Sequence, residues 1–504
     1  MDWELLADQP LGQKLIKKWF WLYFFMIITA PAGYLIRVLI SNSISVEDVG
    51  IIYSVIWFIG IISAYHDLWL TEALQYHLPK YRIQKKYNAF KTSIYFTLIV
   101  QTITWLIIAF ILFFGANFLA THYFHSPESA NIIKIFCLYF LGINFYNMLY
   151  SIFTSFQDVA QAKLLEFIRY YATLIFIFCF FIIWWLNIIN FTRWRIIGIL
   201  LGLIISGIVF VKKYRYTITK WKIERDTALL KKQIKYALWV FIWANVAILL
   251  SQVDLQFVIY FLWPKNAGYY SNYLSLVFSF AVITGPLLWY IFPLTTELVE
   301  KQEHEKIKQF KKILYKYFSL FAITISGLFF VLWPEIATIL FWQKFIYSGE
   351  LLRYSAPFLI FYVLFNINFG FLAGMGKVKQ RAKMIFIALV INIILNAIFI
   401  QFRWIIGVLS ATMISWIILF YLSHKLVNHK ERIDFDWAYL AKNIIGVIII
   451  CIGIYCIKDK IFILEDSYRY KNLIYIVLIT LGYYLYILWI NYKNLRAVKN
   501  MFLE

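Results

Sequence analysis

Long apolar segments joined by short polar connections make up most of this chain. A helix that crosses a bilayer needs about 20 apolar residues, and fourteen segments meet that requirement. Continuous apolar runs such as Leu98 to Phe114 lack the alternation of a barrel strand, so every span is predicted to be helical. The predicted spans cover residues 19–40, 48–66, 92–114, 132–152, 169–187, 195–211, 236–261, 269–292, 315–333, 352–373, 384–400, 404–423, 439–457 and 472–491.

Composition supports this assignment. Hydrophobic residues make up 62% of the 504 residues and charged residues only 15%, whereas soluble domains are about 45–50% apolar and about 25% charged. A water-soluble fold of this length could not bury so much apolar surface. The sequence therefore predicts an all-α polytopic membrane protein, and it excludes a soluble enzyme, a disordered chain and a disulfide scaffold.

The charge distribution predicts the orientation of the spans. The chain has 48 Lys and Arg against 26 Asp and Glu, a formal net charge of +22. With the N-terminus in the cytoplasm, and with cations in the first two residues of a span counted with the adjoining loop, 35 of the 48 cations fall in cytoplasmic segments and 10 in outer loops. This bias follows the positive-inside rule, so both termini are predicted to be cytoplasmic. Because this rule explains the excess of positive charge, no nucleic-acid partner is expected.

The chain also shows an internal duplication. Residues 46–54, after the first span, are similar to residues 264–272, after the seventh, with Gly50 and Gly268 at an offset of 218. Six spans per repeat give both lobes the same orientation and a pseudo-two-fold axis along the membrane normal, an arrangement found in transporters. Two further pairs match, 157–163 with 376–383 and 194–198 with 404–407. The predicted domains are an N-terminal six-helix lobe (1–212), a basic cytoplasmic linker (213–235), a C-terminal six-helix lobe (236–425), and two additional helices with a cytoplasmic tail (426–504).

Several stretches resemble the bacterial polysaccharide flippases of the multidrug/oligosaccharidyl-lipid/polysaccharide (MOP) superfamily. The resemblance covers about residues 15–425, with Trp69 where the family usually has Gly. The matching stretches are Leu35-Ile36-Arg37-Val38-Leu39 with Val46-Glu47-Asp48-Val49-Gly50, Asp67-Leu68-Trp69-Leu70-Thr71-Glu72-Ala73-Leu74 with Leu78-Pro79-Lys80-Tyr81, Leu250-Ser251-Gln252-Val253-Asp254 with Ala267-Gly268-Tyr269-Tyr270, Phe292-Pro293, Leu332-Trp333-Pro334-Glu335-Ile336 and Gly374-Met375-Gly376-Lys377.

The resemblance implies a transporter that flips a polyprenyl-pyrophosphate-linked oligosaccharide from the cytoplasmic to the outer leaflet by alternating access. It further implies a multi-pass protein of the bacterial cytoplasmic membrane that acts in surface polysaccharide biosynthesis. The expected partners are the lipid-linked oligosaccharide, membrane lipids and polysaccharide assembly enzymes, and the expected oligomeric state is a monomer. Three alternatives stay open: a cation-coupled multidrug antiporter, a peptidoglycan-precursor flippase, and a polytopic glycosyltransferase or polysaccharide polymerase.

Charged residues inside spans are the first candidates for a mechanism, because such residues are costly in hydrocarbon. Arg37 in the first span is expected to contact pyrophosphate through its planar donor fork, with snorkelling to the interface as the alternative. Asp254 in the seventh span is a candidate site for Na⁺ or H⁺ coupling, or a structural carboxylate. The offset of 218 places Asp254 opposite position 36, so we expect a gating salt bridge between Arg37 and Asp254.

Two further sets of candidates are expected to line the pathway. The first set flanks spans five and eleven in repeat-related positions, although the positive-inside rule alone also explains such cations: Lys163, Arg169, Arg381 and Lys383. The second set would line a wet cleft and bind sugar hydroxyls, with hydrogen bonds between helices as the alternative: Gln101, Asn147, Gln252, Asn366 and Asn392.

Motifs for enzymatic chemistry are scarce. No P-loop is present, and the outer loop at 334–351 has only Glu335 and Glu350 as acidic residues. His122 and His125 share one outer loop without a third His or Cys, so a metal site there is not expected, and the four cysteines lie in apolar stretches without a CxxC pair. We therefore expect a protein that is not an enzyme and that needs neither a metal nor another cofactor.

Overall fold

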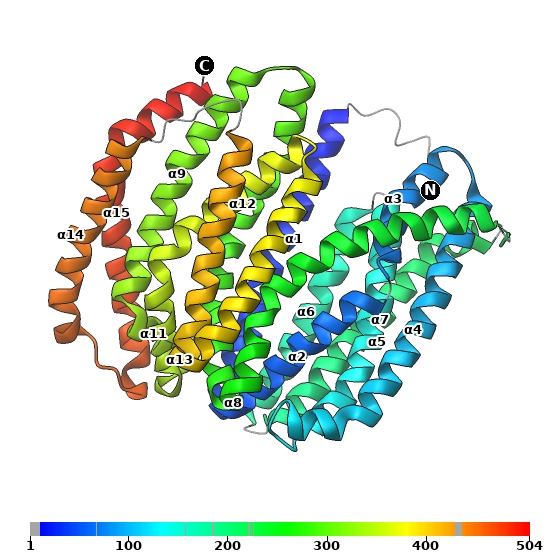
Figure 1. Ribbon diagram of the computed structural model, residues 1–504, viewed down its shortest axis with the longest axis horizontal. Helices are drawn as coiled ribbons and strands as arrows, with labels where there is room; N and C mark the ends of the chain where they lie inside the picture. Colours follow the sequence, from blue (N-terminus) through cyan, green and yellow to red (C-terminus); the bar gives the residue numbers. More distant parts are fainter. Residues whose placement is uncertain are drawn as a thin grey trace. The chain divides into compact units, whose positions relative to one another are not determined.

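The computed structural model describes residues 11–66, 68–156, 158–183, 186–219, 222–224, 226–428 and 436–503, and over these residues it is helical without strands (Figure 1). The α-helices are α1 (Leu11–Ser43), α2 (Val46–His66), α3 (Leu70–Ile83), α4 (Tyr87–His122), α5 (Ser129–Ser155), α6 (Val159–Ile182), α7 (Ile188–Thr219), α8 (Thr227–Glu300), α9 (His304–Val331), α10 (Trp333–Phe341), α11 (Ile346–Ser355), α12 (Leu359–Gly374), α13 (Val378–Val427), α14 (Trp437–Ile461) and α15 (Arg469–Leu503).

Each predicted span falls on one or more helices, and the span at 352–373 covers the end of α11 together with α12, which confirms the all-helical polytopic fold. Two helices, α8 and α13, are longer than one bilayer crossing and hold two predicted spans each. The α8 helix breaks at Trp263, whose φ of 71° is non-helical, and the following Pro264 disfavours helical backbone at that position. The α13 helix breaks at Arg403 and Trp404. Counting these halves separately accommodates fourteen crossings; by length and composition, ten described helical stretches qualify as membrane spans.

Three short helices, α3, α10 and α11, were not expected as separate elements: α3 and most of α10 lie between predicted spans, and α11 overlaps the start of the span at 352–373. They have 14, 9 and 10 residues, so none reaches the length of about 20 residues that a crossing requires. A search for long apolar runs cannot find such helices. Their stability comes from packing against the spans.

The chain divides into two compact units, residues Met1–Ala267 and Gly268–Glu504. This division assigns residues 236–267 to the first unit, whereas the predicted second lobe begins at residue 236. The predicted domain limits therefore stay a prediction.

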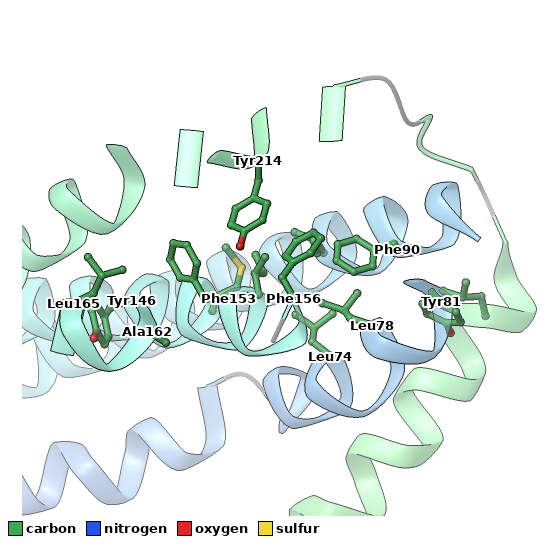
Figure 2. Packing of buried hydrophobic residues seen from close by; sticks show 14 of the residues in the cluster. Leu74, Leu78, Tyr81, Phe90, Tyr146, Phe153, Phe156, Ala162, Leu165 and Tyr214 are labelled. Carbon is green, nitrogen blue, oxygen red and sulfur yellow. The ribbon is translucent and has the colours of Figure 1, made fainter. Parts of the chain in front are cut away.

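The core of the first unit fixes α3 in place. Figure 2 shows Leu74 and Leu78 of α3 close to Phe90 of α4 and to Phe156 of α5, in one buried hydrophobic cluster. Tyr214 of α7 stacks on Phe156 with ring centroids 4.3 Å apart and an interplanar angle of 14°. Aromatic pairs of this kind add about 0.5–1.5 kcal/mol beyond their burial. The buried leucines of α3 pack into the same cluster, which holds α3 in the core of the unit.

In the second unit, the two helices outside the predicted repeat pack together with α9 (Figure 1). Tyr483 of α15 is buried and donates a hydrogen bond to the carbonyl oxygen of Thr324 in α9, at 2.7 Å. Lys458 of α14 lies 3.7 Å from the buried carboxylate of Glu335 in α10. The additional helices are therefore fastened by both apolar and polar contacts.

Two glycines of the duplicated motif 194–198 and 404–407 have the same packing role. A Cβ atom on Gly198 of α7 would lie 1.9 Å from Oγ1 of Thr173 in α6. A Cβ atom on Gly407 would lie 2.3 Å from the carbonyl oxygen of Phe399, across the break in α13. Each glycine thus allows the last span of its predicted repeat to approach the preceding span closely, which supports the duplication.

Candidate functional site: an arginine cluster in the first unit

Three helices of the first unit bring arginine side chains together: Arg37 on α1, Arg169 on α6 and Arg195 on α7. Arg37 is only 6% exposed, and the other two are half-buried. Arg37 lies within electrostatic range of Arg195, and Tyr139 of α5 is hydrogen-bonded to Arg195 while interacting electrostatically with Arg169. These three arginines are called the arginine cluster below.

Tyrosine rings surround the cluster. Cation–π contacts of this kind contribute about 0.5–2 kcal/mol each, depending on desolvation. A tyrosine ring stabilises a guanidinium group without neutralising it, whereas a carboxylate would cancel the charge. The distances from the guanidinium carbon to the ring centroid are 3.2 Å from Arg37 to Tyr53, 4.7 Å and 4.6 Å from Arg169 to Tyr146 and Tyr170, and 5.3 Å from Arg195 to Tyr139.

One carboxylate lies next to the cluster but does not balance it. Glu166 of α6 interacts electrostatically with Arg169, and it also forms an ion pair with Lys163 at 2.6 Å. Lys163 in turn lies 5.5 Å from the ring centroid of Tyr150. Lys163 and Arg169 therefore share Glu166, so this part of the region carries a net positive charge.

Small residues make room for the Arg169 side chain. A Cβ atom on Gly202 of α7 would lie 2.9 Å from Cβ and 3.0 Å from Cγ of Arg169. On α1, Gly33 has Tyr170 as its nearest neighbour, at 3.6 Å from an added Cβ. The helices α1, α6 and α7 thus approach one another at the cluster because two of them present glycine there.

The chemistry of the cluster suits a polyanion. Guanidinium groups bind phosphate oxygens through two parallel N–H donors, and tyrosine hydroxyls can add neutral donors. Burying cations costs several kcal/mol per ion unless charge and hydrogen bonds compensate. An anionic ligand that entered this region would gain favourable charge interactions with these arginines.

Asp254, the other predicted gate residue, lies on α8. Gln256 donates a hydrogen bond to the carbonyl oxygen of Ser54 in α2, at 3.3 Å. Gln252 lies against Gly60, which is also in α2. Residues two apart on a helix point about 200° apart, so Asp254 lies on the opposite side of α8 from both glutamines. Its side chain is buried, with 5% exposed, and it points away from α2.

Arg37, in contrast, faces α2, because its guanidinium group stacks on Tyr53. Arg37 and Asp254 are both buried, with Arg37 directed towards α2 and Asp254 away from it. The Arg37–Asp254 ion pair and a coupling ion at Asp254 stay predictions.

The remaining candidates have different surroundings. In the first unit, Gln101 donates a 2.7 Å hydrogen bond to Thr71 of α3, and Asn147 is exposed. In the second unit, Asn366 bonds within its own helix and Asn392 accepts a hydrogen bond from Asn396; Arg381 is half-buried against Phe369, and Lys383 is exposed. The structure thus joins Arg37, Arg169 and Lys163 in one region and places Arg381 and Lys383 in the other unit.

Sequence reasoning missed Arg195 as a candidate and counted it with the outer-loop cations. The apolar run begins only at Arg195, whereas α7 begins at Ile188, two turns earlier. Arg195 is therefore an intrahelical cation. The sequence signal for Arg195 was the duplicated motif 194–198, in which Trp194 and Arg195 precede Gly198 at the start of a span.

Metal binding has no support in the part of the chain that the structure describes. Its residues contain no group of three or more His, Cys, Asp or Glu side chains placed to hold a metal ion.

Known proteins share this fold. The chain is similar to the lipid II flippase MurJ in an inward closed conformation, with a TM-score of 0.71, 18% identity, and coverage of 95% of this chain and 99% of MurJ. It is also similar to an inward-facing multidrug resistance MATE family transporter of the MOP superfamily, with a TM-score of 0.66, 14% identity, and coverage of 80% and 95%. The chain therefore shares the fold of these two solved proteins.

Sequence comparison gives the family. Residues 15–299 match the family described as "Polysaccharide biosynthesis protein", and the chain belongs to this family. An uncharacterised membrane protein of Methanocaldococcus jannaschii, MJ1068, is 26% identical over 475 residues, which cover 90% of each chain.

Proposed function

We propose that this protein flips a polyprenyl-pyrophosphate-linked oligosaccharide from the cytoplasmic to the outer leaflet by alternating access, as a step in surface polysaccharide biosynthesis. It acts in the cytoplasmic membrane with both termini in the cytoplasm, as the distribution of Lys and Arg predicts. The observation that carries the proposal is the arginine cluster, formed by Arg37, Arg169 and Arg195 among tyrosine rings.

The physical problem for such a transporter is to move a charged, hydrated headgroup through hydrocarbon. Even one charged side chain at the centre of a membrane helix costs about 2.5–3.5 kcal/mol on insertion scales, and a pyrophosphate carries more charge. A net positive region inside the helix bundle offsets this cost by charge-assisted hydrogen bonds. The lipid tail needs no such help and stays in the bilayer.

The similarities support a lipid-linked cargo. The chain belongs to the polysaccharide biosynthesis protein family, and its fold covers nearly all of a lipid II flippase. Neither the family nor the fold requires an enzymatic site, so transport is the activity that we assign. Membrane lipids surround the protein, and polysaccharide assembly enzymes are proposed to supply and receive its cargo.

A multidrug antiporter is the second candidate, because the fold is also that of a multidrug resistance MATE transporter. The charge of the arginine cluster favours the flippase. A cationic drug would be repelled by the three arginines and by Lys163, whereas a pyrophosphate would be attracted.

Reconstitution tests the proposal. The protein is placed in liposomes with a fluorescent lipid-linked oligosaccharide, and a membrane-impermeant quencher measures the fraction of headgroups in the outer leaflet without added ATP. We expect the protected fraction to fall as headgroups exchange between leaflets, and we expect R195Q to slow this exchange. K265Q, which changes an exposed lysine outside the cluster, is the matched control. Liposomes in which headgroups stay in place, while a cationic dye is transported, would favour the antiporter.

A further inference from the structure

A corner of the first unit is built from four segments: α3, the start of α4, residues 222–224 with Asp226, and the start of α8. Asn88 and Thr92 of α4 accept hydrogen bonds from the backbone N–H groups of Lys222 and Glu224, both at 2.9 Å. Gln233 of α8 donates a 3.1 Å hydrogen bond to Thr97 of α4. The segment that the sequence predicts as a linker is therefore fastened to the helices of the first unit.

Apolar contacts complete the corner. Leu70 and Ala73 of α3 form a buried cluster with Ala237 of α8, and Phe96 of α4 packs against it. The surface of the corner is then defined by helices with fixed positions, so charged side chains on it are held near one another.

Exposed lysines crowd this surface, and they are called the lysine corner below. The lysine corner consists of Lys80, Lys85, Lys86, Lys222, Lys231, Lys232 and Lys235, all exposed.

Fewer carboxylates oppose these lysines. Glu224 accepts a hydrogen bond from the side chain of Asn88 at 2.5 Å. Asp226 accepts hydrogen bonds from the backbone N–H groups of Ala228 and Leu229, both at 3.0 Å, and thereby caps α8. With Glu72 of α3, these are the carboxylates that the structure describes on the four segments, so the corner keeps a net positive charge.

Two lysines from different helices converge on one point. Lys80 lies 3.6 Å from the centroid of the Tyr76 ring, and Lys232 of α8 is within electrostatic range of the same ring. Beneath them, His77 is buried and stacks on Tyr81 at 5.8 Å. Burial, together with Lys232 and Lys80, lowers the pKa of His77, so the imidazole adds no further positive charge.

Exposed apolar side chains adjoin the lysines. Tyr76, Tyr87, Ile223 and Ile234 are exposed on the same segments. Cations interleaved with exposed aromatic and aliphatic side chains are typical of surfaces that contact lipid headgroups and the adjoining acyl region. A soluble polyanion would match the charge but not these apolar side chains.

We propose that the lysine corner binds the headgroup of an anionic phospholipid, with its phosphate between Lys80 and Lys232. This surface is separate from the arginine cluster, and the binding does not depend on the proposed function. Because residues 222–224 and Asp226 precede α8, a bound lipid holds the start of this helix.

Lipid titration of the full-length, delipidated protein, followed by native mass spectrometry, tests the proposal. We expect phosphatidylglycerol to bind more tightly than phosphatidylcholine. Because each lysine near an anionic surface contributes about a fivefold gain in binding, the K80Q/K231Q/K232Q variant is expected to lose on the order of a hundredfold in phosphatidylglycerol affinity. The loss should shrink as salt is raised.

Two further variants keep the test decisive. K80R/K231R/K232R retains the charges and should bind phosphatidylglycerol as the wild type does. K265Q/K460Q/K471Q removes three exposed lysines elsewhere and should also retain binding. Equal wild-type affinities for the two lipids, an equal loss in the control, or complete displacement by millimolar glycerol 3-phosphate would overturn the proposal. Since no cargo is present, these outcomes leave the flipping experiment unaffected.

Discussion

Substitution of Gly202 by alanine is a direct test of how the arginine cluster is built. The added Cβ would lie 2.9 Å from Cβ of Arg169, whereas carbon atoms in contact prefer about 3.5–4.0 Å. The atoms must therefore separate by roughly half an ångström or more, and neither belongs to the flexible end of a side chain. Overpacking of this kind costs about 1–3 kcal/mol. We expect α6 and α7 to move apart and Arg169 to leave its position between Tyr146 and Tyr170.

The matched control lies on the same helix. Gly207 of α7 has nothing within 4 Å of an added Cβ, so alanine there should gain up to about 1 kcal/mol from helix propensity. Thermal unfolding in detergent should rank G207A above the wild type and G202A below it. In liposomes, G202A should also slow headgroup exchange while G207A does not. A G202A protein as stable and as active as G207A would refute the packing argument.

Three further predictions concern charged residues. R195Q should slow headgroup exchange at least tenfold, because one guanidinium–phosphate hydrogen bond contributes about 1.5–3 kcal/mol, while R195K should recover part of the rate; an unchanged R195Q rate would remove Arg195 from the site. R37D and D254R should each lose transport, and the R37D/D254R protein should regain it if the two residues form a gate; absence of rescue in a correctly folded double variant contradicts the pairing. Burial raises the pKa of the Glu335 carboxyl in α10, so the folded state holds its proton more tightly than the unfolded chain. Stability should therefore be highest below the ordinary carboxyl pKa and fall as pH rises through the raised value. Thermal melts between pH 4 and 8 should show this fall in the wild type and a flatter profile in E335Q, and a stability that rises with pH would contradict it.

Particular elements show where sequence reasoning succeeds. The spans at 92–114 and 132–152 fall inside α4 and α5, because the length of an apolar run is fixed by the thickness of hydrocarbon. The paired glycines, Gly198 and Gly407, lie at close helix contacts in both units. The duplication was therefore visible in the sequence because equivalent packing demands equivalent small residues.

Other elements could not be predicted in this way. The α3 helix is short and polar enough that no apolar run reveals it, and its position depends on the core formed with Phe90 and Phe156. Arg195 was counted with the cations of the outer loop that precedes its span. Hydropathy shows where a helix enters hydrocarbon and not where its backbone begins. The α7 helix starts two turns before the apolar run.

The sequence by itself determined that this chain is a helical membrane protein, with its spans, its charge bias and the polysaccharide flippase resemblance that the family match confirms. These properties depend on local composition, since each helix satisfies its own backbone in lipid. The tertiary structure alone decided that Arg37, Arg169 and Arg195 share one region and that tyrosine rings lie against them. This arrangement depends on the rotation of each helix about its axis and on contacts between side chains more than a hundred residues apart. A local sequence pattern does not contain that information.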